Sequence, residues 1–200
     1  MLVIGLTGPS GAGKGEVATL FASWGLPVIN ADNVYRSLLI PPSSCLRELT
    51  EEFGHEILAP TGELDRPKLS SIVFSDPTAL QRLNSIAHRY VMEEIRRQLD
   101  LLRREGTRAA VLDAPQLFEA GAERDCATVV SVLAQKRLRL ERIMERDGLD
   151  ADSAMRRINA QKSDDYFRAH SDYVIENNGA IENLRPNIKQ ILLEMGVIEN

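Results

Sequence analysis

A glycine-rich turn near the start of the chain limits most strongly what this sequence can fold into. The apolar run at residues 2–6 predicts a buried strand, and a helix is expected over about residues 15–23. The turn between them reads GPSGAGK at residues 8–14, which is the pattern G-x-x-x-x-G-K. Glycines allow successive backbone N–H groups to point at an anion, and a helix N-terminus adds favourable partial charge. The pattern in this setting predicts a phosphate-binding loop, with Lys14 reaching the β- and γ-phosphates of a nucleotide.

The rest of the chain alternates short apolar runs with amphipathic stretches, which is typical of βαβ units around a parallel sheet. Four further strands are expected, at residues 27–29, 109–112, 128–133 and 173–175. All are short and continuously apolar, as strands covered on both faces are. The sequence therefore predicts an α/β fold with a five-stranded parallel sheet.

Two long helical stretches interrupt the alternation. Residues 44–104 are almost entirely helical and too long for a simple crossover, so we expect a helical subdomain beside the sheet. Residues 135–168 form the second stretch, which Gly148 and the sequence DAD at 150–152 divide into two helices. The last helix is expected over about 181–195, where Pro186 either delays its start or kinks it.

Composition narrows the class of partner. The 200 residues suggest one domain, and 24 Lys and Arg against 29 Asp and Glu argue against a nucleic-acid binder. Cys45 and Cys126 lie far apart, which excludes a disulfide framework and indicates reduced thiols. No run approaches the roughly 20 apolar residues of a membrane helix, and the apolar opening lacks the basic region of a secretion signal. We expect a cytoplasmic protein that binds neither nucleic acid nor membrane.

Two aspartates are expected at the carboxyl edge of the sheet, where open parallel sheets bind ligands. Asp32 follows the second strand and Asp113 ends the third, so both should face the same crevice as Lys14. One can hold Mg²⁺ directly or through water, and the other can accept the proton of an attacking hydroxyl. The alternative is that each aspartate only caps a helix.

Three arginines of the second helical stretch share one helix face. Arg139, Arg142 and Arg146 stand at i, i+3 and i+7, and guanidinium groups suit a transferring phosphoryl group. A helical pair carrying them could close over a nucleotide and exclude water. The alternative is an ordinary solvated, charged face.

An ordered series of motifs resembles the dephospho-coenzyme A kinase family over essentially the full length of the chain. The series consists of GLTG through GK at residues 5–14, VINAD at 28–32, LDR at 64–66, VF at 73–74, LNSIAH at 83–88, LDAPQLFE at 112–119, RIMERDGL at 142–149, RINAQ at 157–161 and VIENNG at 174–179. The resemblance implies a three-layer P-loop kinase fold with a nucleotide-binding core (1–40, 105–134 and 169–200), a helical coenzyme-A subdomain (41–104) and a helical lid (135–168). It also implies a monomer or weak homo-oligomer.

The resemblance further implies an activity and its residues. The activity is phosphorylation of the ribose 3′-hydroxyl of dephospho-coenzyme A with ATP and Mg²⁺. The catalytic residues would be Asp32 as the base, Lys14 and Arg142. Contacts to ATP would come from Gly8, Ser10, Gly11, Ala12, Gly13, Lys14, Gly15, Glu16, Arg142, Arg146, Asn177, Asn178 and Gly179. Contacts to the substrate would come from Asp32, Arg66, His88, Asp113, Pro115, Leu117 and Phe118, with Asp113 also holding the metal through water.

Three positions depart from the family pattern. Gly15-Glu16 replaces the usual Ser-Thr, Asn30 replaces an Asp, and Arg89 replaces the Pro after His88. The missing hydroxyl after Lys14 normally touches Mg²⁺. Glu16 would repel a triphosphate unless it points away, pairs with an arginine or meets the metal. Two other functions therefore stay open: a kinase of nucleoside monophosphates or another small molecule, and a nucleotide-binding protein with impaired turnover.

Overall fold

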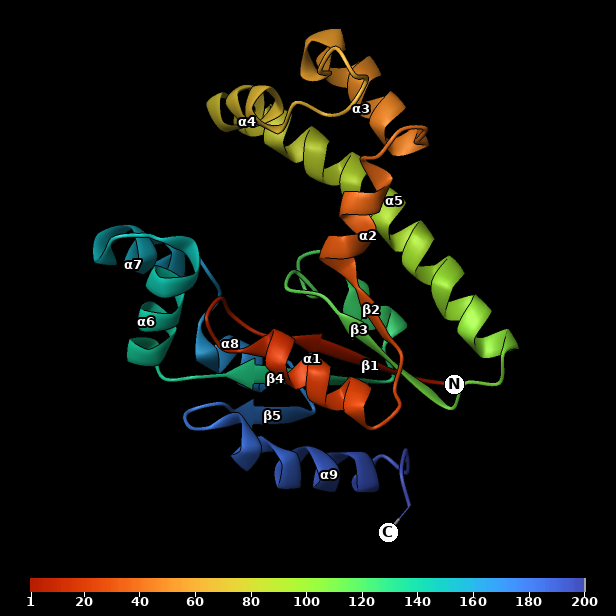
Figure 1. Cartoon of the computed structure of the whole chain (residues 1–200), viewed down its shortest axis with the longest axis vertical. Helices are drawn as coiled ribbons and strands as arrows, with labels where there is room; N and C mark the ends of the chain where they lie inside the picture. The colour runs from red at the N-terminus through yellow and green to blue at the C-terminus, as the bar shows by residue number, and fades with distance from the viewer. Residues whose placement is uncertain (200) are drawn as a thin grey trace. The chain divides into compact units, whose positions relative to one another are not determined.

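The computed structural model describes residues 1–199 and is built on one parallel sheet (Figure 1). The strands, in the order β2-β3-β1-β4-β5 across the sheet, are β1 (Leu2–Thr7), β2 (Val28–Asn30), β3 (Ala109–Asp113), β4 (Thr128–Leu133) and β5 (Tyr173–Glu176). In the register, Ile4 of β1 lies opposite Val111 of β3 and Thr128 of β4. The predicted five-stranded parallel sheet is confirmed.

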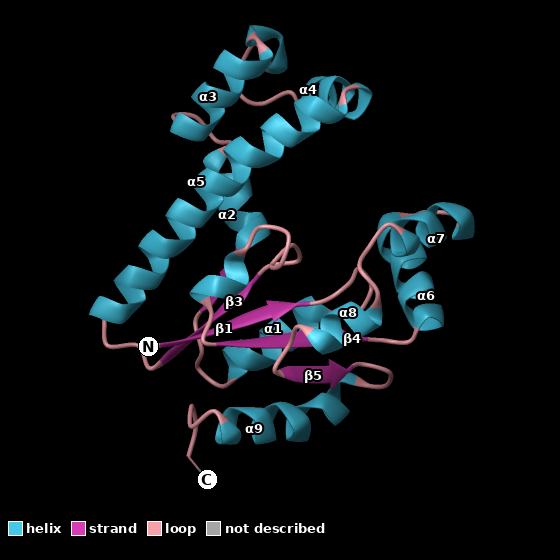
Figure 2. Cartoon of the chain, turned by 180° about the vertical axis from the view of Figure 1, so that it is seen from behind, coloured by secondary structure: helices cyan, strands magenta, loops and turns pink. Residues whose placement is uncertain are grey.

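Helices cover both faces of the sheet, which explains the continuous apolar runs of the strands (Figure 2). Helices α1 (Lys14–Ser23) and α9 (Leu184–Glu194) pack against the sheet through a common apolar core. Its members include Val17 and Phe21 of α1 and Ile188 of α9, all fully buried. β3 and β4 are buried along their whole length, and β1, which the glycine-rich loop follows, lies between them.

Helix α9 begins later than the chain's helical pattern suggests. A 3₁₀ turn at Ile181–Asn183 precedes it, and Pro186 is the third residue of the helix. Proline is tolerated there because the first amides of a helix have no intrahelical acceptor. Of the two expected effects of Pro186, the delayed start is the one observed.

The described chain divides into two compact units. The core unit comprises Met1–Ile29 and the residues from Leu102 onward, and the helical unit comprises Asn30–Leu101. The helical unit contains α2 (Ala31–Leu38), α3 (Ser44–Phe53), a 3₁₀ turn (His55–Ile57), α4 (Arg66–Ser75) and most of α5 (Pro77–Arg104). It has its own apolar cluster, with Leu49 and Ile57 fully buried. The boundaries at 41 and 104 inferred from the family resemblance stay predictions.

The second helical stretch contains three helices rather than two. α6 (Lys136–Asp147) ends at Gly148, whose φ is +64°, and Asp150 caps α7 (Ala151–Asn159) by accepting a bond from the Ser153 N–H at 2.7 Å. The predicted break at Gly148 is therefore confirmed. A short helix, α8 (Asp164–Ala169), follows because Ser163 caps it. α6 and α7 are held together by a small apolar cluster around Ile143.

Two glycines offer a matched test of how tightly the sheet is packed. A methyl group at Gly5 in β1 would lie 2.8 Å from Cys126 Sγ and 2.9 Å from Leu117 Cδ2, whereas a methyl group at Gly15 in α1 would meet nothing within 4 Å. We expect Gly5→Ala to lower the free energy of unfolding by about 1–3 kcal/mol through overpacking. Gly15→Ala should raise it by up to about 1 kcal/mol, because alanine favours a helix. Urea unfolding measures both, and equal effects would contradict the packing described.

Candidate functional site

The glycine-rich loop after β1 can be built only from glycine at its two ends. Gly8 and Gly13 have φ values of +147° and +89°. A side chain at Gly8 would place its Cβ 2.2 Å from the Val132 carbonyl oxygen, and one at Gly13 would place it 2.0 Å from Asn177 Nδ2. Because Gly13 also precedes α1 and has no side chain to cap it, the first amides of the helix can face an anion.

Side chains from elsewhere in the core unit hold three successive carbonyl oxygens of this loop. The Ser10 carbonyl accepts a bond from Arg139 Nε at 3.0 Å, the Gly11 carbonyl from Arg142 Nη1 at 3.2 Å, and the Ala12 carbonyl from Asn177 Nδ2 at 2.9 Å. The oxygens are thereby directed toward donors of the protein. The loop's conformation is consequently fixed from its carbonyl side.

Lys14 forms an ion pair with Asp113, the last residue of β3. The two side chains are 14% and 3% exposed, so the pair is screened little by water. β1 and β3 are neighbours, with Leu6 opposite Asp113, so the two charges meet at the carboxyl edge of the sheet as expected. Asp113 therefore serves the loop, and the alternative of a helix cap is wrong for it.

Asp32 lies in the first turn of α2, in the helical unit. The cap of this helix is Asn30, whose side-chain oxygen accepts a bond from the Asn33 N–H at 2.9 Å. Asp32 itself is exposed. The helix-cap alternative is therefore wrong for Asp32 too, and the departure at Asn30 keeps a capping side chain. The assignment of Asp32 as the base stays a prediction.

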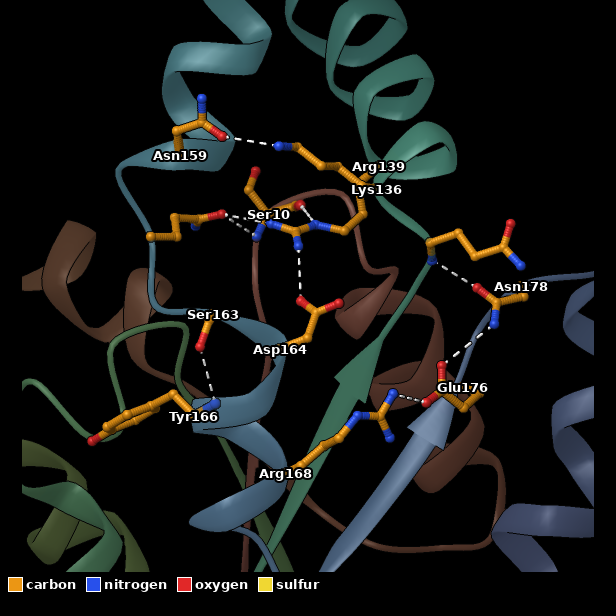
Figure 3. A network of polar contacts seen from close by, with 12 residues as sticks. Ser10, Lys136, Arg139, Asn159, Ser163, Asp164, Tyr166, Arg168, Glu176 and Asn178 are labelled. Atoms are coloured by element: carbon orange, nitrogen blue, oxygen red, sulfur yellow. Dashed lines mark hydrogen bonds and ion pairs between the residues drawn. The ribbon is translucent and has the colours of Figure 1, made fainter.

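The arginine face of α6 is turned toward the loop. Arg139 is only 4% exposed and is bound on three sides (Figure 3), and Arg142 bonds the Gly11 and Asn177 carbonyls, each at 3.2 Å. Arg146 donates to Ser10 Oγ at 3.2 Å, and its hydrogen bonds to Asp147 hold the pKa of that carboxyl below its usual range. Burial lowers the pKa of the Arg139 guanidinium, while the Asp164 charge opposes the shift. The solvated-face alternative is thus wrong for Arg139 and Arg142.

The turn after β5 joins the loop to the start of α6. Asn177 is 1% exposed, and its Nδ2 also donates to Glu16 Oε2 at 3.3 Å. Asn178 accepts a bond from the Gln135 N–H at 2.7 Å, next to the first residue of α6. Glu16 therefore meets an asparagine, a partner that the sequence reasoning had not considered. Within residues 1–199, Asn177 Oδ1 is buried without a hydrogen-bond partner. The expected nucleotide contact at Gly179 stays a prediction.

The segment after β3 carries three of the expected substrate residues. The Pro115 carbonyl accepts a bond from Thr7 Oγ1 at 3.3 Å. Leu117 has no exposed surface, and its role toward the substrate stays a prediction. The Phe118 ring lies edge-on to Tyr166 of α8, with 5.6 Å between centroids, and Tyr166 stacks on His170 at 4.0 Å. The sequence did not predict this aromatic group, because Phe118 is far along the chain from Tyr166 and His170.

Besides Asp32, two further expected substrate residues belong to the helical unit. Arg66 is the exposed first residue of α4, after the capping Asp65, and His88 lies inside α5. α5 runs unbroken through His88 and Arg89, so no turn follows the histidine. Arg89 donates to Glu48 Oε1 at 2.5 Å, and this bond, with one from Tyr90, holds the Glu48 pKa below its usual range. Arg89 is thus engaged by a carboxylate of its own unit, and the roles of Arg66 and His88 stay predictions.

The parallel sheet, the glycine loop that opens α1 and the Lys14–Asp113 pair define the chain as a P-loop kinase.

Comparison with known proteins gives the family. The family model described as Dephospho-CoA kinase matches residues 2–183. The chain is similar to Dephospho-CoA kinase of Corynebacterium efficiens (41% identical over 98% of each chain) and of Syntrophotalea carbinolica (39% identical over 98% of this chain and 92% of the relative). It is also similar to the solved structure of dephospho-CoA kinase from Campylobacter jejuni, with a TM-score of 0.72, 25% identity and 96% of each chain covered. The chain belongs to the dephospho-CoA kinase family.

The buried ion pair predicts a specific pattern of stability. Lys14→Met removes the Lys14 cation from beside the buried Asp113 carboxylate, and we expect the free energy of unfolding to fall by about 3 kcal/mol. Adding Asp113→Asn removes that charge and should recover at least half of the loss. The control is Lys68→Met, which breaks a pair with Asp65 that is more open to solvent and should cost much less. Urea unfolding without nucleotide measures all three variants, and the absence of any recovery on adding Asp113→Asn would contradict the coupling.

Proposed function

We propose that this chain transfers the γ-phosphoryl group of ATP to the ribose 3′-hydroxyl of dephospho-coenzyme A, which is the reaction its family is named for. The observation that carries the proposal is the phosphate loop itself. Its carbonyls are tied back by Arg139, Arg142 and Asn177, and Lys14 stands at its end. Such a loop suits the β- and γ-phosphates of a nucleoside triphosphate.

Each charged side chain of the site has its own role in phosphoryl transfer. Lys14 and the loop amides hold the triphosphate in line with the acceptor, and Asp113 holds Lys14 in place. Arg142 uses two of the five N–H donors of a guanidinium on loop and turn carbonyls, which leaves others for phosphoryl oxygens. Asp32 accepts the proton of the ribose hydroxyl as that oxygen attacks the γ-phosphorus, and the bond from the γ-phosphorus to the β–γ bridging oxygen breaks to release ADP. Positioning and electrostatics supply most of such catalysis.

A magnesium ion fits these residues only with help from the substrate. Among residues 1–199, no three His, Cys, Asp or Glu side chains gather into a metal site. Asp113, which pairs with Lys14 at the loop, would hold the ion through water, and phosphate oxygens and waters would supply the remaining ligands, as is usual for Mg²⁺. When bound, Mg²⁺ neutralises charge that develops on the phosphates.

The sequence analysis also gave expectations about the protein's location, partners and oligomeric state. In the described part of the chain, no helix is both long and apolar enough to cross a bilayer. A cytoplasmic location, the absence of nucleic-acid partners and a monomeric or weakly oligomeric state stay predictions.

The acceptor base can be tested at Asp32. We expect Asp32→Asn to lower turnover of dephospho-coenzyme A by about 10²–10⁴-fold, because the hydroxyl loses its proton acceptor, while ATP affinity stays within about twofold. Coupled ADP release and calorimetry measure the two. The control is Asp152→Asn, which changes an exposed aspartate at the same first-turn position of α7. Near wild-type turnover of Asp32→Asn would refute the base, and faster turnover of AMP or CMP than of dephospho-coenzyme A would refute the substrate.

The missing hydroxyl after Lys14 allows a test of metal handling. Gly15 is helical and has open space around its Cβ position, so a serine fits there without displacing a neighbour. We expect Gly15→Ser to lower, by several-fold, the Mg²⁺ concentration at which a non-hydrolysable ATP analogue is half bound. Gly15→Ala, which adds the carbon without the hydroxyl, should leave it unchanged. An identical response of the two variants would show that the position does not touch the metal.

A further inference from the structure

In the phosphate loop, every polar group of Ser10 forms a hydrogen bond. Its N–H donates to Gln161 Oε1 at 3.0 Å, its carbonyl accepts from Arg139 Nε at 3.0 Å, and its hydroxyl accepts from Arg146 Nη2 at 3.2 Å. Gln161 lies in the connection between α7 and α8, and both arginines lie on α6. Ser10 is therefore hydrogen-bonded to the second helical stretch at three points.

Gln161 closes a ring of hydrogen bonds around the Ser10 peptide groups. Its Oε1 accepts from Ser10 N–H and also from Arg139 Nη2 at 3.1 Å, while Arg139 Nε binds the Ser10 carbonyl. Asp164 Oδ1, at the start of α8, accepts a third hydrogen bond from the guanidinium, from Arg139 Nη1 at 3.1 Å (Figure 3). One amide oxygen thus fixes the loop N–H and the arginine together.

The ring leaves Arg139 little freedom to do anything else. The side chain is 4% exposed and has bonds to a carbonyl, an amide and a carboxylate. The backbone of Arg139 also packs closely against the loop, since a Cβ at Gly11 would lie 2.7 Å from the Arg139 carbonyl oxygen. Arg139 therefore supports the loop, and Gln161 orients both Arg139 and the Ser10 N–H.

We infer that Gln161 is a positioning residue for the nucleotide: its side-chain oxygen holds the Ser10 peptide and Arg139 so that the phosphate loop keeps the shape that binds ATP. The inference rests on the proposed function, because it takes the loop to be the ATP site. It adds a residue from the α7–α8 connection to the determinants of nucleotide affinity. A change at Gln161 consequently acts on ATP and leaves the binding of the other substrate alone.

The test compares two substitutions of similar size. Gln161→Met removes the oxygen acceptor, and Gln161→Glu keeps it beside the Arg139 cation. With calorimetry, we expect Gln161→Met to bind a non-hydrolysable ATP analogue about tenfold more weakly, as for one lost hydrogen bond of a charged group. Its affinity for dephospho-coenzyme A should be unchanged, and Gln161→Glu should restore nucleotide affinity to within about threefold of wild type. The control is Gln190→Met, at an exposed glutamine that bonds Glu194 within α9.

Hydrogen exchange at the loop adds a readout of its shape. In Gln161→Met, the Ser10 amide should exchange faster than in wild type, while the amides of β4 keep their protection. Wild-type nucleotide affinity in Gln161→Met, or an equal loss of affinity for both substrates with a lowered melting temperature, would overturn the positioning role. Failure of Gln161→Glu to restore affinity would also overturn it. Failure of the wild-type chain to bind the analogue at all would instead refute the proposed function.

Discussion

The site depends on the satisfaction of three consecutive carbonyl oxygens in the phosphate loop. A loop that offers its N–H groups to an anion must turn its carbonyls the other way, and a buried carbonyl without a donor is costly. Arg139, Arg142 and Asn177 supply those donors from α6 and from the turn after β5. The second helical stretch is therefore part of the structure that supports the loop, and its role as a lid stays a prediction.

The Lys14–Asp113 pair shows how the sheet serves the same loop. β1, which the loop follows, and β3, which ends at Asp113, are neighbouring strands. Their carboxyl ends therefore lie side by side in the sheet. A lysine that already has a carboxylate partner keeps its orientation before the nucleotide arrives, which reduces the cost of ordering it on binding.

The general architecture was predictable from local patterns, because each pattern has one physical cause. Continuous apolar runs indicate strands that are buried on both faces, and the glycine spacing indicates a loop that curls around an anion. The site details were less accessible. The spacing of Arg139, Arg142 and Arg146 predicts a shared helix face, but the sequence does not say what packs on it. Gln161 ends the RINAQ motif, but the sequence assigns it no role, since an amide acquires its role only from neighbours that folding brings to it.

The loop's supporting donors also determine when, during synthesis, it can take shape. The loop lies near the N-terminus, yet the partners of its carbonyls are 129, 131 and 165 positions further along the chain. Contacts of such long range form late in folding and close large loops of chain. A ribosome-bound fragment that ends before the turn after β5 would carry the whole glycine motif without the frame that shapes it. The loop therefore takes its binding shape only after the turn that follows β5 has been synthesised.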